Sequence, residues 1–165
     1  MLDFVPVHDT PEDYAEFEKL EEGFYRHYTK LGIGEQFGRL PYESVPPELV
    51  RKEFDRYIQG NGEQESYFMF VKIGTQVVGY VCGWIKNKNG CYADPRIAHL
   101  ESLYLNESER GKGYSSSMAE AFFSWARSKG VHACQLEVYA KNRDALAVYK
   151  KWGFEEDELI LWKPL

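Results

Sequence analysis

The residues best suited to chemistry lie in one short segment, residues 107–117, which reads ESERGKGYSSS. An apolar stretch at 97–105 precedes it, and apolar residues with helical spacing follow at 114–130. The first four backbone amides of a helix have no partner inside the helix, and the helix dipole adds about half a positive charge there. Glycine and serine leave such amides accessible, and Arg110 and Lys112 add positive charge. The segment therefore predicts a turn that binds a phosphate group.

Two other kinds of phosphate-binding loop fit this segment less well. The nucleotide-binding pattern GxxxxGK[ST] is absent, and the dinucleotide pattern GxGxxG would need a glycine where Ser116 stands. A dinucleotide-binding turn also follows the first strand of its domain, whereas this turn lies about two-thirds of the way along the chain. The remaining alternative is a turn loosened by glycine, with its charges simply solvated.

The composition limits the class of protein. The chain has 165 residues, a length typical of one domain with its own core. A net charge of −6 and a pI near 5.3 argue against nucleic acid as a partner. No stretch resembles a membrane span or a signal peptide, and Cys82, Cys91 and Cys134 are well separated, as in a reducing compartment. We therefore expect a cytoplasmic protein, with no membrane partner and no metal, because no His/Cys cluster has zinc spacing.

Apolar periodicity and turn residues predict the elements that position the glycine turn. The expected order is β-α-α-β-β-β-α-β-α-β, which indicates a single α/β domain over residues 1–165 with one mixed central sheet. The expected strands are residues 3–8, 66–74, 76–87, 97–105, 133–140 and 157–165. The expected helices are residues 47–60, 114–130 and 142–154, and one that begins at Pro11.

The first predicted helix is amphipathic. Thr10 is suited to cap it, and Pro11 favours its first position. Its apolar face carries Tyr14, Phe17, Leu20, Phe24, Tyr25 and Tyr28. Its other face is acidic and carries Glu12, Asp13, Glu16, Glu18, Glu21 and Glu22. An acidic helix beside many tyrosines favours a cationic partner.

A second motif lies downstream, where residues 142–154 read NRDALAVYKKWGF. Together with Arg110-Gly111-Lys112-Gly113-Tyr114-Ser115, it resembles the signature of the GCN5-related N-acetyltransferases, the GNAT superfamily. That signature is a strand, then [R/Q]-x-x-G-x-[G/A] opening a helix, then a strand, then N-x-x-A-x-x-x-Y-x-x-x-G-F. The match covers about residues 96–156 and departs at Ser115, where the family has Gly or Ala. Serine is small, so access of a phosphate to the backbone is retained.

The resemblance implies acetyl-CoA as the acetyl donor and an amine as its acceptor. The diphosphate of CoA would lie on the amides from Gly111 to Ser116. The pantetheine arm would insert where two neighbouring strands splay apart. The residues that the resemblance assigns to CoA are Leu103, Tyr104, Leu105, Arg110, Gly111, Lys112, Gly113, Tyr114, Ser115, Ser116, Asn142 and Ala145.

Acetyl transfer to an amine needs a base, because an alkyl ammonium has a pKa near 10.4. Populating its neutral form at pH 7 costs roughly 4–5 kcal/mol. Glu101 is the preferred base, and it matches a glutamate that polyamine-acetylating members of the family carry. His99, on the same strand face by alternation, is the rival base. The alternative for Glu101 is an exposed strand glutamate without a catalytic role, and a lone strand histidine such as His99 is more often structural.

Tyr149 matches the tyrosine that the family places near the thioester sulfur, which implies that it is the acid for the departing thiolate. Glu137 is a further candidate for contact with the acceptor, or a solvent-facing residue. A backbone amide near Leu105 is suited to hold the oxyanion of the tetrahedral intermediate. Transfer through an acetylated cysteine is disfavoured, because no activating base is identifiable beside any cysteine.

These residues predict direct N-acetylation of a primary amine, with a small cationic amine as the expected acceptor. Two alternatives stay open: acetylation of protein amino termini or lysines, and a non-catalytic CoA-binding module on the same fold. The resemblance also allows a homodimer, which no segment of the chain predicts.

Overall fold

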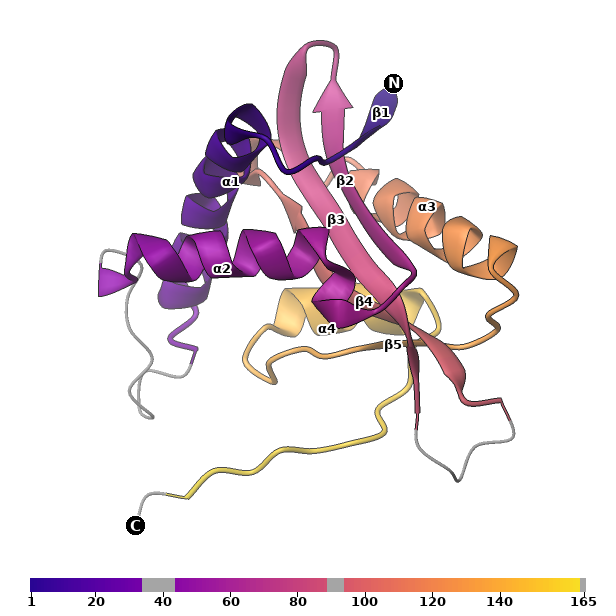
Figure 1. The fold of residues 1–165 in the computed structure, drawn as a ribbon. Helices are drawn as coiled ribbons and strands as arrows, with labels where there is room; N and C mark the ends of the chain where they lie inside the picture. The colour runs from indigo at the N-terminus through magenta and orange to yellow at the C-terminus, as the bar shows by residue number, and fades with distance from the viewer. Residues whose placement is uncertain (34–43, 89–93, 164–165) are drawn as a thin grey trace.

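The structure is a computed structural model that describes residues 1–33, 44–88 and 94–163. Its centre is a five-stranded sheet in the order β1-β2-β3-β4-β5 (Figure 1). Neighbouring strands are antiparallel from β1 to β4, and β5 pairs with β4 in parallel. The strands are β1 (Leu2–Pro6), β2 (Ser66–Ile73), β3 (Gln76–Asn87), β4 (Arg96–Leu105) and β5 (Cys134–Leu136).

Helices cover both faces of the sheet. Helices α1 and α2 lie on one face and α3 on the other (Figure 1). The end of α4 contacts the start of α3, where Trp152 Nε1 donates to Ser116 Oγ at 3.2 Å. No helix within the described ranges has the length and apolar character that crossing a membrane requires. The helices are α1 (Pro11–Lys30), α2 (Pro47–Ile58), α3 (Tyr114–Ser128) and α4 (Arg143–Lys151), with short 3-10 turns at Gly60–Gly62 and Glu107–Glu109.

The predicted α/β fold is confirmed, and its elements begin for the expected reasons. At the start of α1, Thr10 Oγ1 accepts a hydrogen bond from the amide of Asp13 at 3.2 Å, and Pro11 takes the first helical position. Aromatic side chains fill the core beneath α1 and α2, where the rings of Phe17 and Tyr80 have centroids 5.3 Å apart. On the opposite face, α3 packs Phe122 and other apolar residues against the sheet.

A β-bulge between β3 and β4 decides which side chains face α1 and α2. Cys82 pairs with Ser102 and Gly83 with Leu100, so Glu101 is the extra residue of the bulge. Strand alternation would place Glu101 and Ser102 on opposite faces. The bulge instead directs both toward α1 and α2, where Glu101 contacts α2 and Ser102 contacts β3.

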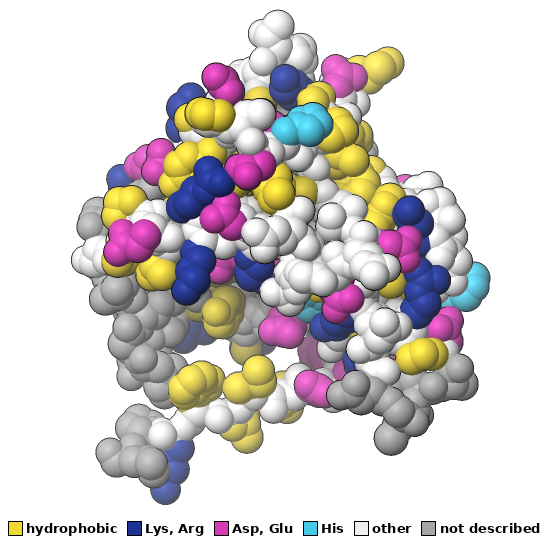
Figure 2. All heavy atoms as spheres, in the orientation of Figure 1, with side chains coloured by type: hydrophobic (Ala, Val, Ile, Leu, Met, Phe, Trp, Pro, Cys, Tyr) yellow, Lys and Arg dark blue, Asp and Glu magenta, His cyan; other side chains and the backbone are white. Residues whose placement is uncertain are grey.

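Two predicted elements at the C-terminal end are wrong in extent. The strand expected at 133–140 is only Cys134–Leu136, and no strand forms within 157–163, the described part of the last predicted strand. The reason is that a strand must pair along its length, whereas residues 157–163 leave the body of the protein (Figures 1 and 2). The apolar side chains of this segment are 69–88% exposed: Leu159, Ile160, Leu161 and Trp162. The β-propensity of these residues is therefore not enough to form a strand without a neighbouring strand to pair with.

Glu21 corrects the predicted acidic face of α1. It is 1% exposed, because it lies four residues after Phe17 and shares the buried face of the helix. The hydroxyl of Tyr80 donates to Glu21 Oε1, and Ser102 Oγ donates to the Tyr80 hydroxyl at 3.1 Å. Burial raises the pKa of Glu21 to about 8, although the bond from Tyr80 opposes the rise. The core thus holds a carboxyl group that is protonated at neutral pH.

Stability should depend on pH through Glu21. Its folded-state pKa of about 8 lies above its ordinary value of 4.5, so between these values the unfolded state binds fewer protons than the folded state. The free energy of unfolding should therefore fall as pH rises across this window, by up to about 1.4 kcal/mol per pH unit from this group. Glu21→Gln should remove that fall, as measured by urea denaturation at pH 5 and pH 8.

The matched control is Glu22→Gln, which changes the half-exposed neighbour on α1. This variant should keep the pH dependence of the wild-type protein. Parallel stability curves for Glu21→Gln and the wild type would contradict the raised pKa.

Candidate active site

The start of α3 presents unpaired backbone amides. The residue before the helix is Gly113, which has φ of 82° and no side chain to cap it. Gly111 also has a positive φ, 76°, and nothing lies within 4 Å of a Cβ placed at either glycine. The amide of Ser116 donates to the carbonyl of Gly113 at 3.2 Å, but those from Gly111 to Ser115 donate to no group in the described chain. The predicted helix tip is therefore open and rich in donors.

The two positive charges of this turn have partners within the protein. Arg110 Nε donates to the carbonyl of Leu105 at 3.0 Å, and its Nη1 lies 3.3 Å from His27 Nδ1. Burial, and then the charge of Arg110, lower the pKa of His27. Lys112 Nζ lies 2.9 Å from Glu109 Oε2. In this structure neither side chain is free beside the amides.

An open strand edge leads to the helix tip. β4 pairs with β5 only over Ala98–Leu100, so the β5-facing edge from Glu101 to Leu105 lacks a strand partner. The chain leaves the sheet after Leu136 and packs on the end of α1. Its contacts there are Tyr139 with Tyr28, at 5.4 Å between centroids, and Lys141 Nζ with the carbonyl of Gly32, at 2.5 Å. The two strands thus part after Leu100 and Leu136, as the splay required by the resemblance predicts.

The predicted residues of α4 lie beyond this open edge. Asn142 is buried and caps the helix, since its side chain accepts from the amide of Ala145 at 3.3 Å. Tyr149 is half-buried against Trp152 and Phe154, with ring centroids at 5.5 and 6.1 Å. Burial raises the pKa of the Tyr149 hydroxyl, so it holds its proton throughout the physiological range.

Of the other predicted residues, Leu103 and Tyr114 pack on the core beneath α3, while Glu137 is exposed. Burial raises the pKa of Cys134 to about 12 and that of Cys82 well above its usual value. A cysteine nucleophile is thus disfavoured at both described cysteines. Cys91 lies outside the described residues.

Glu101 belongs to a chain of charged and polar groups. Its Oε1 lies 2.5 Å from Arg56 Nη2, and its Oε2 lies 2.9 Å from His99 Nε2. The other ring nitrogen of His99 lies 3.1 Å from Lys86 Nζ. Burial alone would raise the pKa of Glu101, but the bonds from His99 and Arg56 and the charge of Arg56 outweigh it and lower the pKa to about 2. The group is therefore a permanent anion, held in place by two donors.

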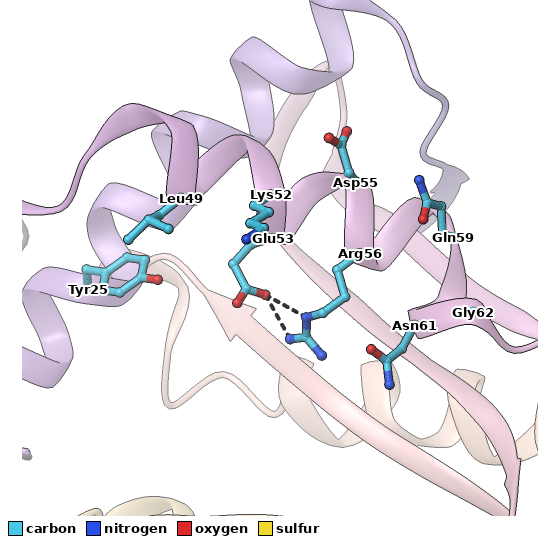
Figure 3. A pocket seen from close by; sticks show the side chains of 9 residues that line it. All are labelled: Tyr25, Leu49, Lys52, Glu53, Asp55, Arg56, Gln59, Asn61 and Gly62. Carbon is cyan, nitrogen blue, oxygen red and sulfur yellow. Dashed lines mark hydrogen bonds and ion pairs between the residues drawn. The ribbon is translucent and has the colours of Figure 1, made fainter.

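Arg56 connects Glu101 to a pocket of about 580 Å³ that the sequence did not reveal (Figure 3). Arg56 also bonds Glu53, one turn earlier on α2, through both Nε and Nη2. The spacing of charged residues along residues 47–60 is the only sequence signal for this wall. The pocket is lined by Tyr25, Leu49, Lys52, Glu53, Asp55, Arg56, Gln59, Asn61 and Gly62.

Removing Arg56 should change the titration of Glu101. In Arg56→Met the carboxylate keeps its burial and the bond from His99 but loses both the bond and the charge of Arg56, so its pKa should rise from about 2 toward the ordinary 4.5. Carbon-detected NMR titration measures this value, with the resonance assigned by its loss in Glu101→Gln. Arg51→Met is the matched control, because Arg51 lies on the same helix but pairs with Asp9 and Asp55. Equal Glu101 pKa values in the two variants would contradict the assigned cause.

Comparison with known proteins agrees with this geometry. The model of the "Acetyltransferase (GNAT) family" matches residues 34–154. An N-acetyltransferase of Methanocaldococcus jannaschii is 26% identical over 99 residues, which are 58% of this chain and 42% of that relative. The streptothricin acetyltransferase of Escherichia coli is 28% identical over 145 residues, 87% of this chain and 77% of the relative. The chain thus spans less than half of the first relative and about three-quarters of the second.

Solved structures share the fold. A predicted acetyltransferase of Clostridium acetobutylicum, solved with acetyl-CoA, superposes with a TM-score of 0.67 at 18% identity, over 99% of this chain and 96% of the other. With the paired motifs, the open helix tip and a family match over most of its length, the chain belongs to the acetyltransferase (GNAT) family.

Proposed function

We propose that this protein transfers the acetyl group of acetyl-CoA directly to a primary amine of a small cationic molecule. The observation that carries the proposal is the set of free amides from Gly111 to Ser115, placed at the end of an open strand edge. We propose one catalytic domain over residues 1–165, with the CoA-binding part at about 96–156.

In this proposal the helix tip and the open edge of β4 bind acetyl-CoA. The unpaired amides from Gly111 to Ser115 face the diphosphate, which the positive end of the α3 dipole favours. The amide of Ser116 would join them only by giving up its bond to the Gly113 carbonyl. The pantetheine arm carries amide groups, and these suit the β5-facing backbone groups of β4 along Leu103, Tyr104 and Leu105, which no strand pairs. Asn142 shapes the far side by capping α4 at Ala145. Binding would leave Arg110 on the Leu105 carbonyl or draw it toward the diphosphate.

Glu101 and Tyr149 are the proposed catalytic residues. Glu101 stays ionised at every physiological pH, so it can accept a hydrogen bond from the attacking amine and orient it. A pKa of about 2 makes it a weak proton acceptor, which favours removal of the proton through water beside Glu101 rather than its storage on the carboxyl. His99 holds Glu101 and faces Lys86, so we assign it a positioning part. Tyr149 retains its proton and can donate it to the departing thiolate.

The pocket beside Glu101 supports a polar, cationic acceptor. Glu53 and Asp55 supply carboxylates there, and Arg56, which pairs with Glu53 and with Glu101, joins Glu101 to the pocket wall and neutralises part of the charge. The similarity to a streptothricin acetyltransferase, which extends over most of this chain, points in the same direction. A small amine with several positive charges fits this setting better than an extended peptide, and the peptide remains an outcome that the assay distinguishes.

An acceptor screen tests the proposed function. Protein and acetyl-CoA are mixed with streptothricin, neamine, spermidine or a peptide with a free amino terminus, and CoA release is followed with a thiol reagent. We expect turnover with at least one of the small cationic amines, and an acetylated product by mass spectrometry. Tyr149→Phe, which keeps the ring but loses the proton donor, should lower kcat by about 100-fold or more without changing the KM for acetyl-CoA.

The screen separates the alternatives. Acetylation of the peptide alone would show a protein-modifying enzyme. Binding of CoA in a calorimeter without turnover of any amine would show a regulatory module. Absence of both binding and turnover would overturn the proposal.

The helix tip is tested by two glycines at opposite ends of α3. Gly113 and Gly130 have φ of 82° and 74° and open space at the Cβ position. Alanine at either position should cost a similar amount of stability, on the order of 1 kcal/mol, through backbone strain. Only Gly113→Ala should also weaken CoA binding, by about tenfold or more in calorimetry, because its methyl group lies over the amides. Equal CoA affinity in the two variants would refute a diphosphate site at this tip.

A further inference from the structure

Among the buried side-chain nitrogen and oxygen atoms of the described residues, only Oε1 of Gln135 has no hydrogen-bond partner. Other buried polar groups nearby are paired: Ser102 with Tyr80, and His99 with Glu101. Proteins pair at least nine in ten such groups, because a buried acceptor without a partner destabilises the fold. A group retained at that cost is suited to a partner that arrives from outside the fold.

The strand register places Gln135 beside the proposed acetyl acceptor. Gln135 of β5 is opposite His99 of β4, so their side chains share one face of the sheet. The neighbours of Gln135 along the strand, Cys134 and Leu136, pack toward α3 on the other face. Gln135 therefore lies on the face where His99 contacts Glu101 at 2.9 Å.

The position of Gln135 along β5 also places it close to the start of the open edge of β4. Leu136 is the last residue of β5 that pairs with β4, and the open edge begins opposite Glu101. Gln135 thus stands where the two strands begin to part. In the proposed function, this is the end of the cleft where the amine meets the thioester.

We infer that the Gln135 carboxamide oxygen accepts a hydrogen bond from the acceptor amine that Glu101 also holds. Both oxygens of Glu101 already receive one bond each, from Arg56 and His99. The Gln135 oxygen is a second hydrogen-bond acceptor for the amine, and it carries no charge. It therefore stabilises the ammonium form of the amine much less than the Glu101 carboxylate does. Gln135 then helps to orient the amine in its nucleophilic, unprotonated form. This inference rests on the proposed function.

Gln135→Met tests the inference, because methionine has a similar length and no strong hydrogen-bond acceptor. The KM for streptothricin or spermidine should rise about tenfold, while the KM for acetyl-CoA stays unchanged. The melting temperature should stay equal or rise, since the variant removes an unpaired buried acceptor. A residue with only a structural part would show the reverse, namely lower stability and unchanged kinetics. Gln76→Met, at an exposed site on β3, is the matched control.

Gln135→Glu provides the second arm, since it keeps an acceptor oxygen and adds a charge. This variant should still bind the amine, but its pH optimum for acetylation should shift upward. The added carboxylate stabilises the ammonium form and so raises the pKa of the bound amine. Unchanged amine KM in Gln135→Met, or loss of amine binding in both variants, would overturn the inference. The second result would mean that the carboxamide nitrogen faces the amine.

Calorimetry of streptothricin and spermidine with the CoA-saturated protein separates this inference from the proposed function. An amine that binds without turnover contradicts the proposed function alone, and its affinity in Gln135→Met then decides the inference. No amine binding to the wild-type protein overturns both.

Discussion

The parting of β4 from β5 is the constraint on which the rest of this structure depends. A strand edge with unpaired amides and carbonyls is a liability, and proteins usually cover such an edge or pair it. Here the edge of β4 beyond Leu100 lacks a strand partner, and the departing chain contacts the end of α1 instead, through Tyr139 and Lys141. The open edge, the bulge residue Glu101 and the amides before α3 consequently lie along one continuous path.

Two carboxyl groups on the α1/α2 side of the sheet show how strongly local surroundings set the charge. Glu21 lies in an apolar core with a hydroxyl as its partner, and its pKa is raised to about 8. Glu101 has Arg56 and His99 as partners, and its pKa is lowered to about 2. The bulge produces the surroundings of Glu101. It turns this side chain toward α2, which strand alternation alone would not do, and Glu101 Oε1 lies 2.5 Å from Arg56 Nη2. At neutral pH one carboxyl group is therefore neutral and the other an anion, and only the anion pairs with Arg56, a residue that lines the pocket.

The two sides of the molecule differ in what the family relationship explains. The side proposed to bind CoA depends on backbone amides, a strand edge and small residues, which can persist among distant relatives because they require few particular side chains. The side proposed to bind the acceptor depends on side chains of α1, α2 and β5, such as Glu53, Arg56 and Gln135. Membership of the family therefore indicates the donor more closely than the acceptor.

The sequence by itself determined the order of elements through α4, the open turn before α3 and the family. These features depend on local spacing: glycines with positive φ, a capping residue and apolar periodicity. Only the tertiary structure decided that Glu21 is buried, that Arg56 holds Glu101 and that Gln135 lacks a partner, and it alone showed that residues 157–163 do not form the expected strand. Each of these depends on residues far apart in the chain. Glu101 and Arg56 are separated by 45 positions, and no periodicity in one segment encodes the distance between two segments.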